Sequence, residues 1–285
     1  MKNYQETYVR KAEIAQLILL HQLYSLPGSR EFIFQGGTAL RWCYGGSRFS
    51  EDLDFVTPLD MDVLRAKLNR MMKAAERVMV PHFGHGTLTT SEKTTRKDTL
   101  KLFAVFHPAA SRGKISVKLE FEGIRKDTLP KTKNHVMAVL PAVSYLIASG
   151  DFRIPRPNAV LVAETLPEIL SDKIRALLER RFIKGRDIFD IWYLRTALNT
   201  AADKEAIERK FRMYAWPFKA LRDLKFFANP SAGMKTEMIR AVREDLARFL
   251  PREVFAVNRA EDFAALLTAL RFLFNELLRA EVKVP

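Results

Sequence analysis

The stretch GGTALRWCYGGSRFSEDLDF, residues 36–55, decides the fold of this chain. It follows a short predicted strand over residues 31–35, and its first glycine pair precedes a predicted helix over residues 38–44. Asp52 and Asp54 lie on a second predicted strand, where side chains two positions apart point to the same face. Strand, glycine pair, helix and acidic strand together indicate one connected site for a nucleoside triphosphate (NTP) and its metal ions.

The acid pair predicts a metal site. Two neighbouring carboxylates repel each other when both are ionised, and a divalent cation with oxygen ligands, Mg²⁺ above all, relieves that repulsion. Two such ions, with Mn²⁺ as a substitute, can activate a nucleophile and stabilise a leaving pyrophosphate. A predicted strand at residues 114–122 offers Glu120 as the third acid and Glu122 as the alternative, unless both only face solvent. We expect the metal ligands to be Asp52, Asp54 and Glu120.

The glycine pair predicts the phosphate side of the site. Glycine lets a backbone approach a triphosphate without a Cβ in the way, and N–H groups at a helix N-terminus favour phosphate. An arginine can bind phosphate with both arms of its guanidinium. The alternative for Arg48 is to brace its loop against Asp52. We expect the contacts to the NTP to include Gly36, Gly37, Thr38, Arg48 and Ser50.

Composition narrows the class of protein. Among 285 residues, 48% are hydrophobic and 28% charged, which is typical of a globular chain. Lys and Arg number 47 against 33 Asp and Glu, and the net charge of +14 favours an anionic partner, nucleic acid first. The single Cys43 excludes an internal disulfide and fits a reducing cytoplasm. No run of eighteen apolar residues predicts a membrane span, and the N-terminus lacks the apolar core of a signal peptide.

The first half of the chain reads as alternating helices and strands. Residues 4–24 and 57–80 have the apolar spacing of helices. Residues 99–107 and 114–122 alternate with period two and predict an antiparallel pair of strands. Residues 130–147 read as irregular, with room for a short strand. A group of cations near this pair either binds RNA phosphates or forms a solvated face: Lys93, Arg96, Lys97 and Lys101.

The second half reads as helical. Thr165 and Glu168 predict a capping box, with Pro167 in the first turn of the helix that follows. Gly185 interrupts that helix, and a new one starts beyond it. Further helices are predicted over residues 203–215, 234–249 and 260–279.

Pro155 and Pro157 mark the predicted division between the halves. We predict an α/β (α+β) fold with a mixed sheet over residues 1–155 and a helical bundle over residues 156–285. The second part would contribute side chains to the site of the first.

Two composite motifs carry a resemblance to a known family. The first is GGTAL followed by R-x-S-x-D-L-D-F, which ends here at Phe55. The second reads K-h-x-A-L-x-x-R, where h is apolar, and then R-D-x-x-D-h-[WY]-x-L, over residues 173–180 and 186–194. The GG…D-h-D-h pattern resembles nucleotidyltransferases of the polymerase-β type. The longer form resembles the AbiEii family of nucleotidyltransferase-like toxins.

The resemblance implies a toxin of a type IV toxin–antitoxin or abortive-infection system. It implies a metal-dependent transfer of nucleotides from an NTP to RNA, most plausibly the 3′ end of tRNA, and a DNA-binding antitoxin encoded alongside. We expect the chain to act as a monomer. The alternatives are a small-molecule nucleotidyltransferase, as in antibiotic modification, and a non-catalytic nucleotide- or RNA-binding module. The intact acid pair argues against the non-catalytic module.

The resemblance also assigns residues. Asp52 and Asp54 match the metal-binding pair, and Lys173 matches a lysine expected to contact nucleotide phosphate. Asp187 and Asp190 match the downstream acids of the second motif. Many polymerase-β-type enzymes carry Gly-Ser at the first motif, and Thr38 would supply that hydroxyl one position later.

Helix geometry favours Asp187 as the acid of the site. On an unbroken helix it would lie about 40° from the face of Lys173, and Asp190 about 100° away. Arg180, at the end of the lysine block, and Asp190 are further candidates for binding the nucleotide. The alternative for either aspartate is an ion pair with Arg180, Arg181 or Arg186.

Overall fold

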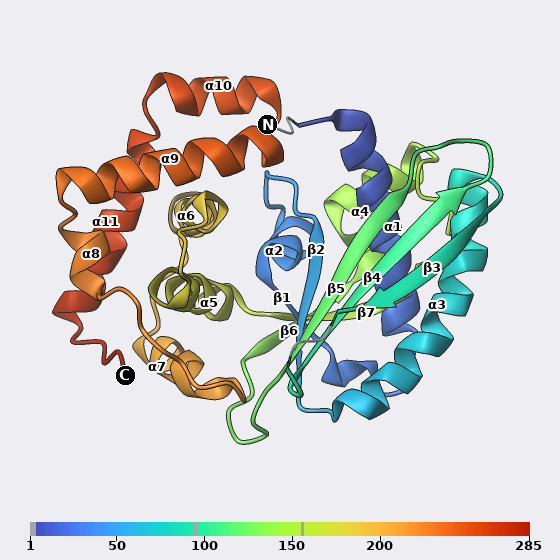
Figure 1. Ribbon diagram of the computed structural model, residues 1–285, viewed down its shortest axis with the longest axis horizontal. Coiled ribbons are helices and arrows are strands. Elements are labelled where there is room, and N and C mark those ends of the chain that lie inside the picture. The colour runs from blue at the N-terminus through green and yellow to red at the C-terminus, as the bar shows by residue number, and fades with distance from the viewer. Residues whose placement is uncertain (1–3, 94–95, 155–156) are drawn as a thin grey trace.

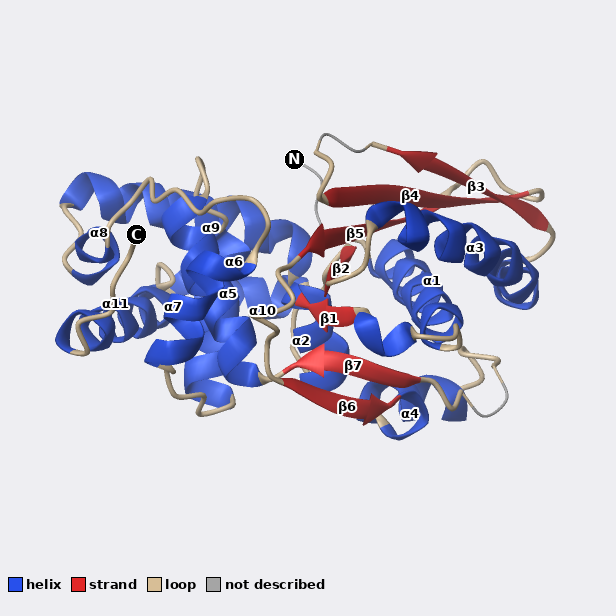
Figure 2. Ribbon diagram, turned by 90° about the horizontal axis from the view of Figure 1, so that it is seen from below, coloured by secondary structure: helices blue, strands red, loops and turns tan. Residues whose placement is uncertain are grey.

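A mixed β-sheet forms one half of the molecule and a group of helices the other (Figures 1 and 2). The computed structural model describes residues 4–93, 96–154 and 157–285. In these residues the sheet has seven strands in the order β3-β4-β5-β2-β1-β7-β6. The strands are β1 (Ile33–Gln35), β2 (Asp52–Thr57), β3 (Gly86–Glu92), β4 (Thr99–Pro108), β5 (Ile115–Gly123), β6 (Thr132–Val136) and β7 (Val160–Glu164).

Helices cover the sheet and form the second half. The first half contains α1 (Glu6–Tyr24), α2 (Gly36–Tyr44), α3 (Met61–Phe83) and α4 (Pro141–Ala148), with 3₁₀ turns at Ser29–Glu31 and Met137–Val139. The second half contains α5 (Leu166–Glu179), α6 (Gly185–Trp192), α7 (Lys204–Met213), α8 (Leu224–Ala228), α9 (Ala232–Phe249), α10 (Arg252–Ala260) and α11 (Ala264–Arg279), with a π-helical turn at Tyr193–Ala197 after α6. None of the described helices is long and apolar enough to span a bilayer.

Alternation along the two central strands fixes which side chains meet. β2 runs parallel to β5, so that Asp54 lies opposite Glu120. The intervening apolar residues point to the other face, where Phe55 stacks on Phe121 with ring centroids 4.7 Å apart. Both rings are fully buried in the core that α1 and α3 cover. Burying this face leaves the acids on the opposite face of the sheet, as their spacing predicts.

The sequence predicts most elements correctly. The expected antiparallel strands at 99–107 and 114–122 are β4 and β5. The short strand allowed within residues 130–147 is β6, but the interpretation of the remainder as irregular is wrong, because it contains α4. The predicted capping box is also wrong. Thr165 makes no side-chain cap, and the Glu168 carboxylate instead accepts hydrogen bonds from the Lys131 N–H and from Arg209.

The sheet extends beyond the predicted division. Pro155 and Arg156, where that division falls, lie outside the described residues. β7 follows them and pairs parallel with β1, with Phe34 opposite Ala163. It also pairs antiparallel with β6. The strand between β1 and the edge strand β6 therefore comes from the part of the chain expected to be helical, and α5 starts directly after it.

Candidate active site

A cleft of about 190 Å³ lies between the polar face of the sheet and the first helices of the second half. One wall carries Asp52 and Asp54 from β2 and Glu120 from β5. This wall brings together the three acids that the sequence predicts as metal ligands.

The opposite wall of the cleft is cationic. Lys173 and Arg175 come from α5, Arg180 follows its end, and Arg186 comes from the first turn of α6. Asp187 lies among them. The cleft therefore places carboxylates facing a group of cations, an arrangement that suits a triphosphate bound on one side and metal ions on the other.

Asp54 is the most perturbed acid of the wall. Burial, reinforced by the charges of Asp52 and Glu120, raises its pKa to about 6. Lys118 and Lys173 oppose that shift without cancelling it. Because burial and the neighbouring carboxylates disfavour its ionised form, that form is stabilised most by a nearby cation.

Lys118 and Lys101 partly neutralise the acid wall. The Lys118 ammonium lies 2.9 Å from a carboxylate oxygen of Asp52 and 2.9 Å from one of Glu120. Lys101 lies 2.7 Å from the other oxygen of Glu120. Burial works to raise the pKa of Glu120, but the hydrogen bonds and charges of the two lysines outweigh it and lower that pKa. Glu120 is therefore kept ionised.

The donor set suits a divalent cation, with one condition. Asp52, Asp54 and Glu120 supply the oxygen ligands that Mg²⁺ prefers. Within residues 4–93, 96–154 and 157–285, no three His, Cys, Asp or Glu side chains are already clustered as a metal site. The Lys118 ammonium, between two of the acids, occupies that space. A metal ion fits these ligands when Lys118 withdraws.

The glycine pair lies in the first turn of α2 and packs against two functional side chains. Gly36 has φ +78°, and a Cβ there would lie 2.9 Å from Oδ2 of Asp54. A Cβ on Gly37 would lie 2.2 Å from Nη2 of Arg48. Gly36 lines the cleft, as predicted for a phosphate contact, while Gly37 is buried beneath it. Both glycines allow close packing that no other residue permits.

Thr38 and Ser50 are placed away from the cleft. The Thr38 hydroxyl donates to the backbone oxygen of Asp52 and is fully buried. The backbone oxygen of Ser50 accepts a hydrogen bond of 2.6 Å from Gln16, and its side chain is buried beside Gly37. Their placement indicates that they hold the glycine turn and the acidic strand together.

Arg48 is occupied by an internal partner. Its Nε and Nη2 each donate a 2.6 Å hydrogen bond to the carboxylate of Asp190, and both side chains are buried. Neither residue lines the cleft, so this placement does not support the predicted nucleotide contacts of Arg48 and Asp190. Arg48 does brace its loop, but its partner is Asp190 of α6 and not the predicted Asp52.

A chain of ion pairs leads from this brace to the cleft. Lys173 lies 2.8 Å from Asp190 and 2.8 Å from Asp187, and Arg180 also pairs with Asp187. Burial works to raise the pKa of Asp187, but the charges of Arg180 and Lys173 outweigh it and hold that pKa far below its usual range. Of the two downstream acids, Asp187 lines the cleft, as the helix argument favours. There Asp187 makes the ion pair with Arg180 that the sequence offered as its alternative role.

The two candidate glutamates also differ in placement. Both line the cleft, but Glu120 lies opposite Asp54 and contributes to its pKa shift. Glu122 instead pairs with Arg96 at 3.0 Å. Placement therefore favours Glu120 as the third acid.

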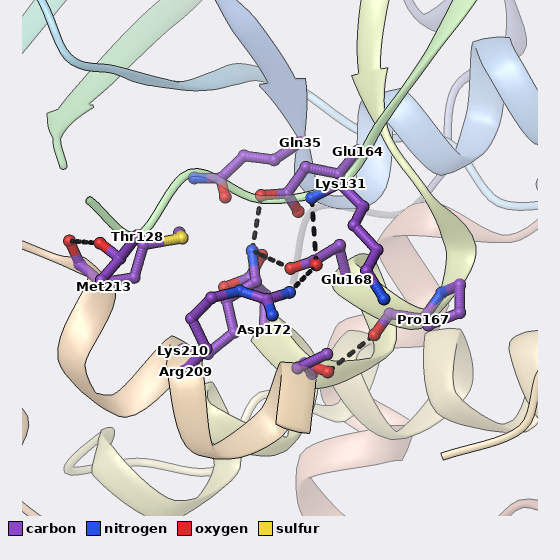
Figure 3. A network of polar contacts seen from close by, with 12 residues as sticks. Gln35, Thr128, Lys131, Glu164, Pro167, Glu168, Asp172, Arg209, Lys210 and Met213 are labelled. Carbon is purple, nitrogen blue, oxygen red and sulfur yellow. Dashed lines mark hydrogen bonds and ion pairs between the residues drawn. The ribbon is translucent and has the colours of Figure 1, made fainter. Parts of the chain in front are cut away.

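A buried polar network supports the cationic wall from behind (Figure 3). Lys210 of α7 is fully buried and lies 2.6 Å from Glu164 and 2.7 Å from Asp172. Asp172 also accepts a 2.6 Å hydrogen bond from Tyr214. Asp172 and Tyr214 both line the cleft. This network joins the last sheet strand β7, α5 and the end of α7 behind the site.

Sequence reasoning missed several residues of the cleft, and Lys210 of the network behind it. Lys118 shares a strand face with Glu120, so the alternation that selected the glutamate could have found it. Arg175 and Arg186 lie within or next to the second motif, which was a usable signal. Tyr214 and Lys210 gave no such signal in the sequence, because an isolated polar residue in a predicted amphipathic helix looks like an ordinary surface position.

Comparisons with known proteins agree with this geometry. A family model described as the nucleotidyl transferase AbiEii toxin of type IV toxin–antitoxin systems matches residues 18–276. A crystal structure from H. pylori, described as that of a candidate nucleotidyltransferase, is similar with a TM-score of 0.58 and 16% identity, over 97% of this chain and 98% of that one. The crystal structure of JHP933 from Helicobacter pylori is similar with a TM-score of 0.57 and 18% identity, over 98% and 96%. These structures share the fold. No curated protein matches the chain significantly.

Proposed function

The chain belongs to the AbiEii family of nucleotidyltransferase toxins of type IV toxin–antitoxin systems, and from that premise we propose that it transfers a nucleotide from an NTP to RNA, at the 3′ end of tRNA. The reaction would depend on Mg²⁺ or Mn²⁺ and take place in the cytoplasm. The observation that carries the proposal is the cleft, in which Asp52, Asp54 and Glu120 face Lys173 and its neighbouring arginines.

The cationic wall would receive the triphosphate. Arg175, Arg180 and Arg186 line it together with Lys173, and preorganised cations stabilise the charge that develops during phosphoryl transfer. Asp187 and Asp190 would act by holding Lys173 in place. The Gly36 backbone would approach the phosphates at the start of α2.

The acid wall would serve the reacting atoms. The oxygen of an RNA hydroxyl forms a bond to the α-phosphorus, the bond from that phosphorus to the bridging oxygen breaks, and pyrophosphate leaves. The hydroxyl proton passes to a carboxylate of this wall, where Glu120 is kept ionised by its lysines. Asp52, Asp54 and Glu120 would hold the metal ions, which when bound supply charge neutralisation and activation of the nucleophile.

Charge and family support the choice of acceptor and partner. A net charge of +14 suits an extended polyanion better than a small-molecule acceptor. A type IV toxin–antitoxin family implies an antitoxin partner, whose absence would let the toxin arrest growth by blocking translation.

Transfer of label tests the proposal. The protein is incubated with each labelled NTP, Mg²⁺ and total RNA, beside Asp54→Asn and the control Asp62→Asn. Asp62 is an exposed acid on α3, outside the cleft. We expect label on tRNA-sized RNA with the wild type and the control, and none with Asp54→Asn. Label on no RNA with any NTP contradicts the proposal, and label on a small molecule instead would favour the antibiotic-type alternative.

A further inference from the structure

The segment that follows α7, residues 214–223, begins at the cleft, which Tyr214 lines. At one end the Ala215 N–H donates to the backbone oxygen of Gly123, at the end of β5. At the other end the Leu221 N–H donates to the backbone oxygen of Leu178, in the last turn of α5. The segment therefore joins the acid wall to the cationic wall.

Buried aromatic contacts anchor this segment. The ring of Tyr214 is buried under the guanidinium of Arg175, which lies 3.8 Å from its centroid. Phe218 packs on Phe211 of α7, with ring centroids 4.5 Å apart. Trp216 lies between these two anchors. Its position is thus fixed by neighbours on both sides.

Trp216 is nevertheless 52% exposed. The guanidinium of Arg96 lies 5.1 Å from its ring centroid, and the same guanidinium donates a 3.0 Å hydrogen bond to Glu122. Because Glu122 lines the cleft, one arginine links the exposed ring to the cleft. An anchored aromatic ring beside a cation at the edge of a phosphate-binding cleft matches the way proteins stack nucleobases.

We infer that Trp216 is a stacking platform for a nucleobase at the mouth of the cleft, with Arg96 beside it to meet phosphate or the base. The inference rests on the proposed function and names the group that holds a base. The base belongs either to the NTP or to the acceptor strand, since both would have phosphates in the same cleft.

Binding measurements with two ligands test this inference. Dissociation constants are measured for an NTP with Mg²⁺ and for a short single-stranded RNA, with the wild type, Trp216→Ala and Trp216→Phe. The control is Phe272→Ala, which removes an aromatic side chain of 64% exposure from α11, outside the cleft. Quenching of tryptophan fluorescence on binding, compared between wild type and Trp216→Phe, reports contact with the ring itself.

Loss of the ring should weaken binding of one ligand by about 5-fold or more, the range of a single base–aromatic stack. Weaker NTP binding assigns the platform to the donor base, and weaker RNA binding assigns it to the acceptor base. Trp216→Phe should keep most of the affinity, and Phe272→Ala all of it. If Trp216→Ala binds both ligands as the wild type does, the inference is wrong while the proposed function stands. If the wild type binds neither, both fail together.

Discussion

At the scale of single residues, the motif glycines act through what they touch. The missing Cβ of Gly37 leaves room for Arg48, which cannot swing aside because Asp190 holds both arms of its guanidinium. The packing role of Gly37 thus lies next to the phosphate contact that we propose for Gly36. Gly36 is next to Asp54 at the cleft, and Gly37 secures the loop behind it.

Gly37→Ala should destabilise the protein. A Cβ 2.2 Å from Nη2 of Arg48 forces apart a buried ion pair, and we expect the free energy of unfolding to fall by about 3 kcal/mol. The control is Gly233→Ala in α9, where a Cβ meets nothing closer than 4.0 Å. That change should be neutral or stabilise by up to about 1 kcal/mol. Urea denaturation measures both, and equal effects would contradict the packing argument.

Asp54→Asn should make the protein more stable at high pH. The native pKa of about 6 lies above the ordinary 3.8, so that between these values the folded state holds a proton the unfolded state has lost. Stability therefore falls as pH rises through this window, by about 3 kcal/mol in total. The asparagine removes that loss. We expect the gain in unfolding free energy to be larger at pH 8 than at pH 5, and no dependence on pH would contradict the shift.

Residue roles were predictable from the sequence where the geometry of a single strand decides them. Alternation placed Asp52, Asp54 and Glu120 on one face correctly, because strand geometry is local. Arg48 and Asp190 lie 142 positions apart, and the sequence assigned Arg48 to phosphate and Asp190 to the acids of the second motif without pairing them. Their pairing depends on how α6 packs against the loop before β2, which no motif spacing reveals.

At the scale of elements, periodic segments were predictable and context-dependent ones were not. The long helices and the strand pair follow directly from their apolar spacing. The capping box at Thr165 failed because Glu168, which would complete it, is drawn to Arg209 and the Lys131 N–H. β7 was missed because its parallel pairing with β1 joins residues more than a hundred positions apart.

The network around Lys210 predicts unequal effects of two substitutions. Burial and the nearby Asp172 raise the pKa of Glu164 well above its ordinary value. Glu164→Gln removes a charge that this environment disfavours and should cost less than about 1.5 kcal/mol of stability. Lys210→Met leaves Asp172 and Glu168 without their buried cation and should cost about 3–5 kcal/mol. Thermal denaturation compares the two, and equal losses would contradict the raised pKa of Glu164.

At the scale of the whole molecule, the cleft depends on both halves staying together. Arg48 from the first half and Asp190 from the second share a buried ion pair, and separating them would leave the buried Arg48 without its carboxylate. The acid wall of the cleft comes from the first half and the cationic wall from the second. Binding and catalysis therefore need a fixed relation between sheet and helices.

This junction predicts that the halves unfold together. Two single-tryptophan variants report on them: one keeps Trp42 of α2, and the other keeps Trp192 of α6. In each, urea denaturation is followed by fluorescence and by far-UV circular dichroism. We expect coincident midpoints for the two probes in both variants. Separate midpoints would instead support two independent domains, divided near residues 155–156.

The distribution of charge, rather than its total, should govern RNA binding. The loop between α5 and α6 presents Arg181 and Lys184 to solvent next to the cationic wall, while Lys73 and Arg77 are exposed on α3, which covers the opposite face of the sheet. Replacing both cations of either pair by glutamine lowers the net charge by two units. If single-stranded RNA follows the cationic wall, only the Arg181→Gln/Lys184→Gln variant should bind more weakly.

Salt dependence makes that comparison quantitative. Each phosphate contact contributes a slope of about −0.7 to log K against log salt for a single strand. The Arg181→Gln/Lys184→Gln variant should therefore lose about 1.4 from the slope of the wild type, and the Lys73→Gln/Arg77→Gln variant nothing. Filter binding at several salt concentrations measures both slopes. Equal losses would mean that RNA responds to the charge of the whole molecule, and that the cleft does not direct the strand.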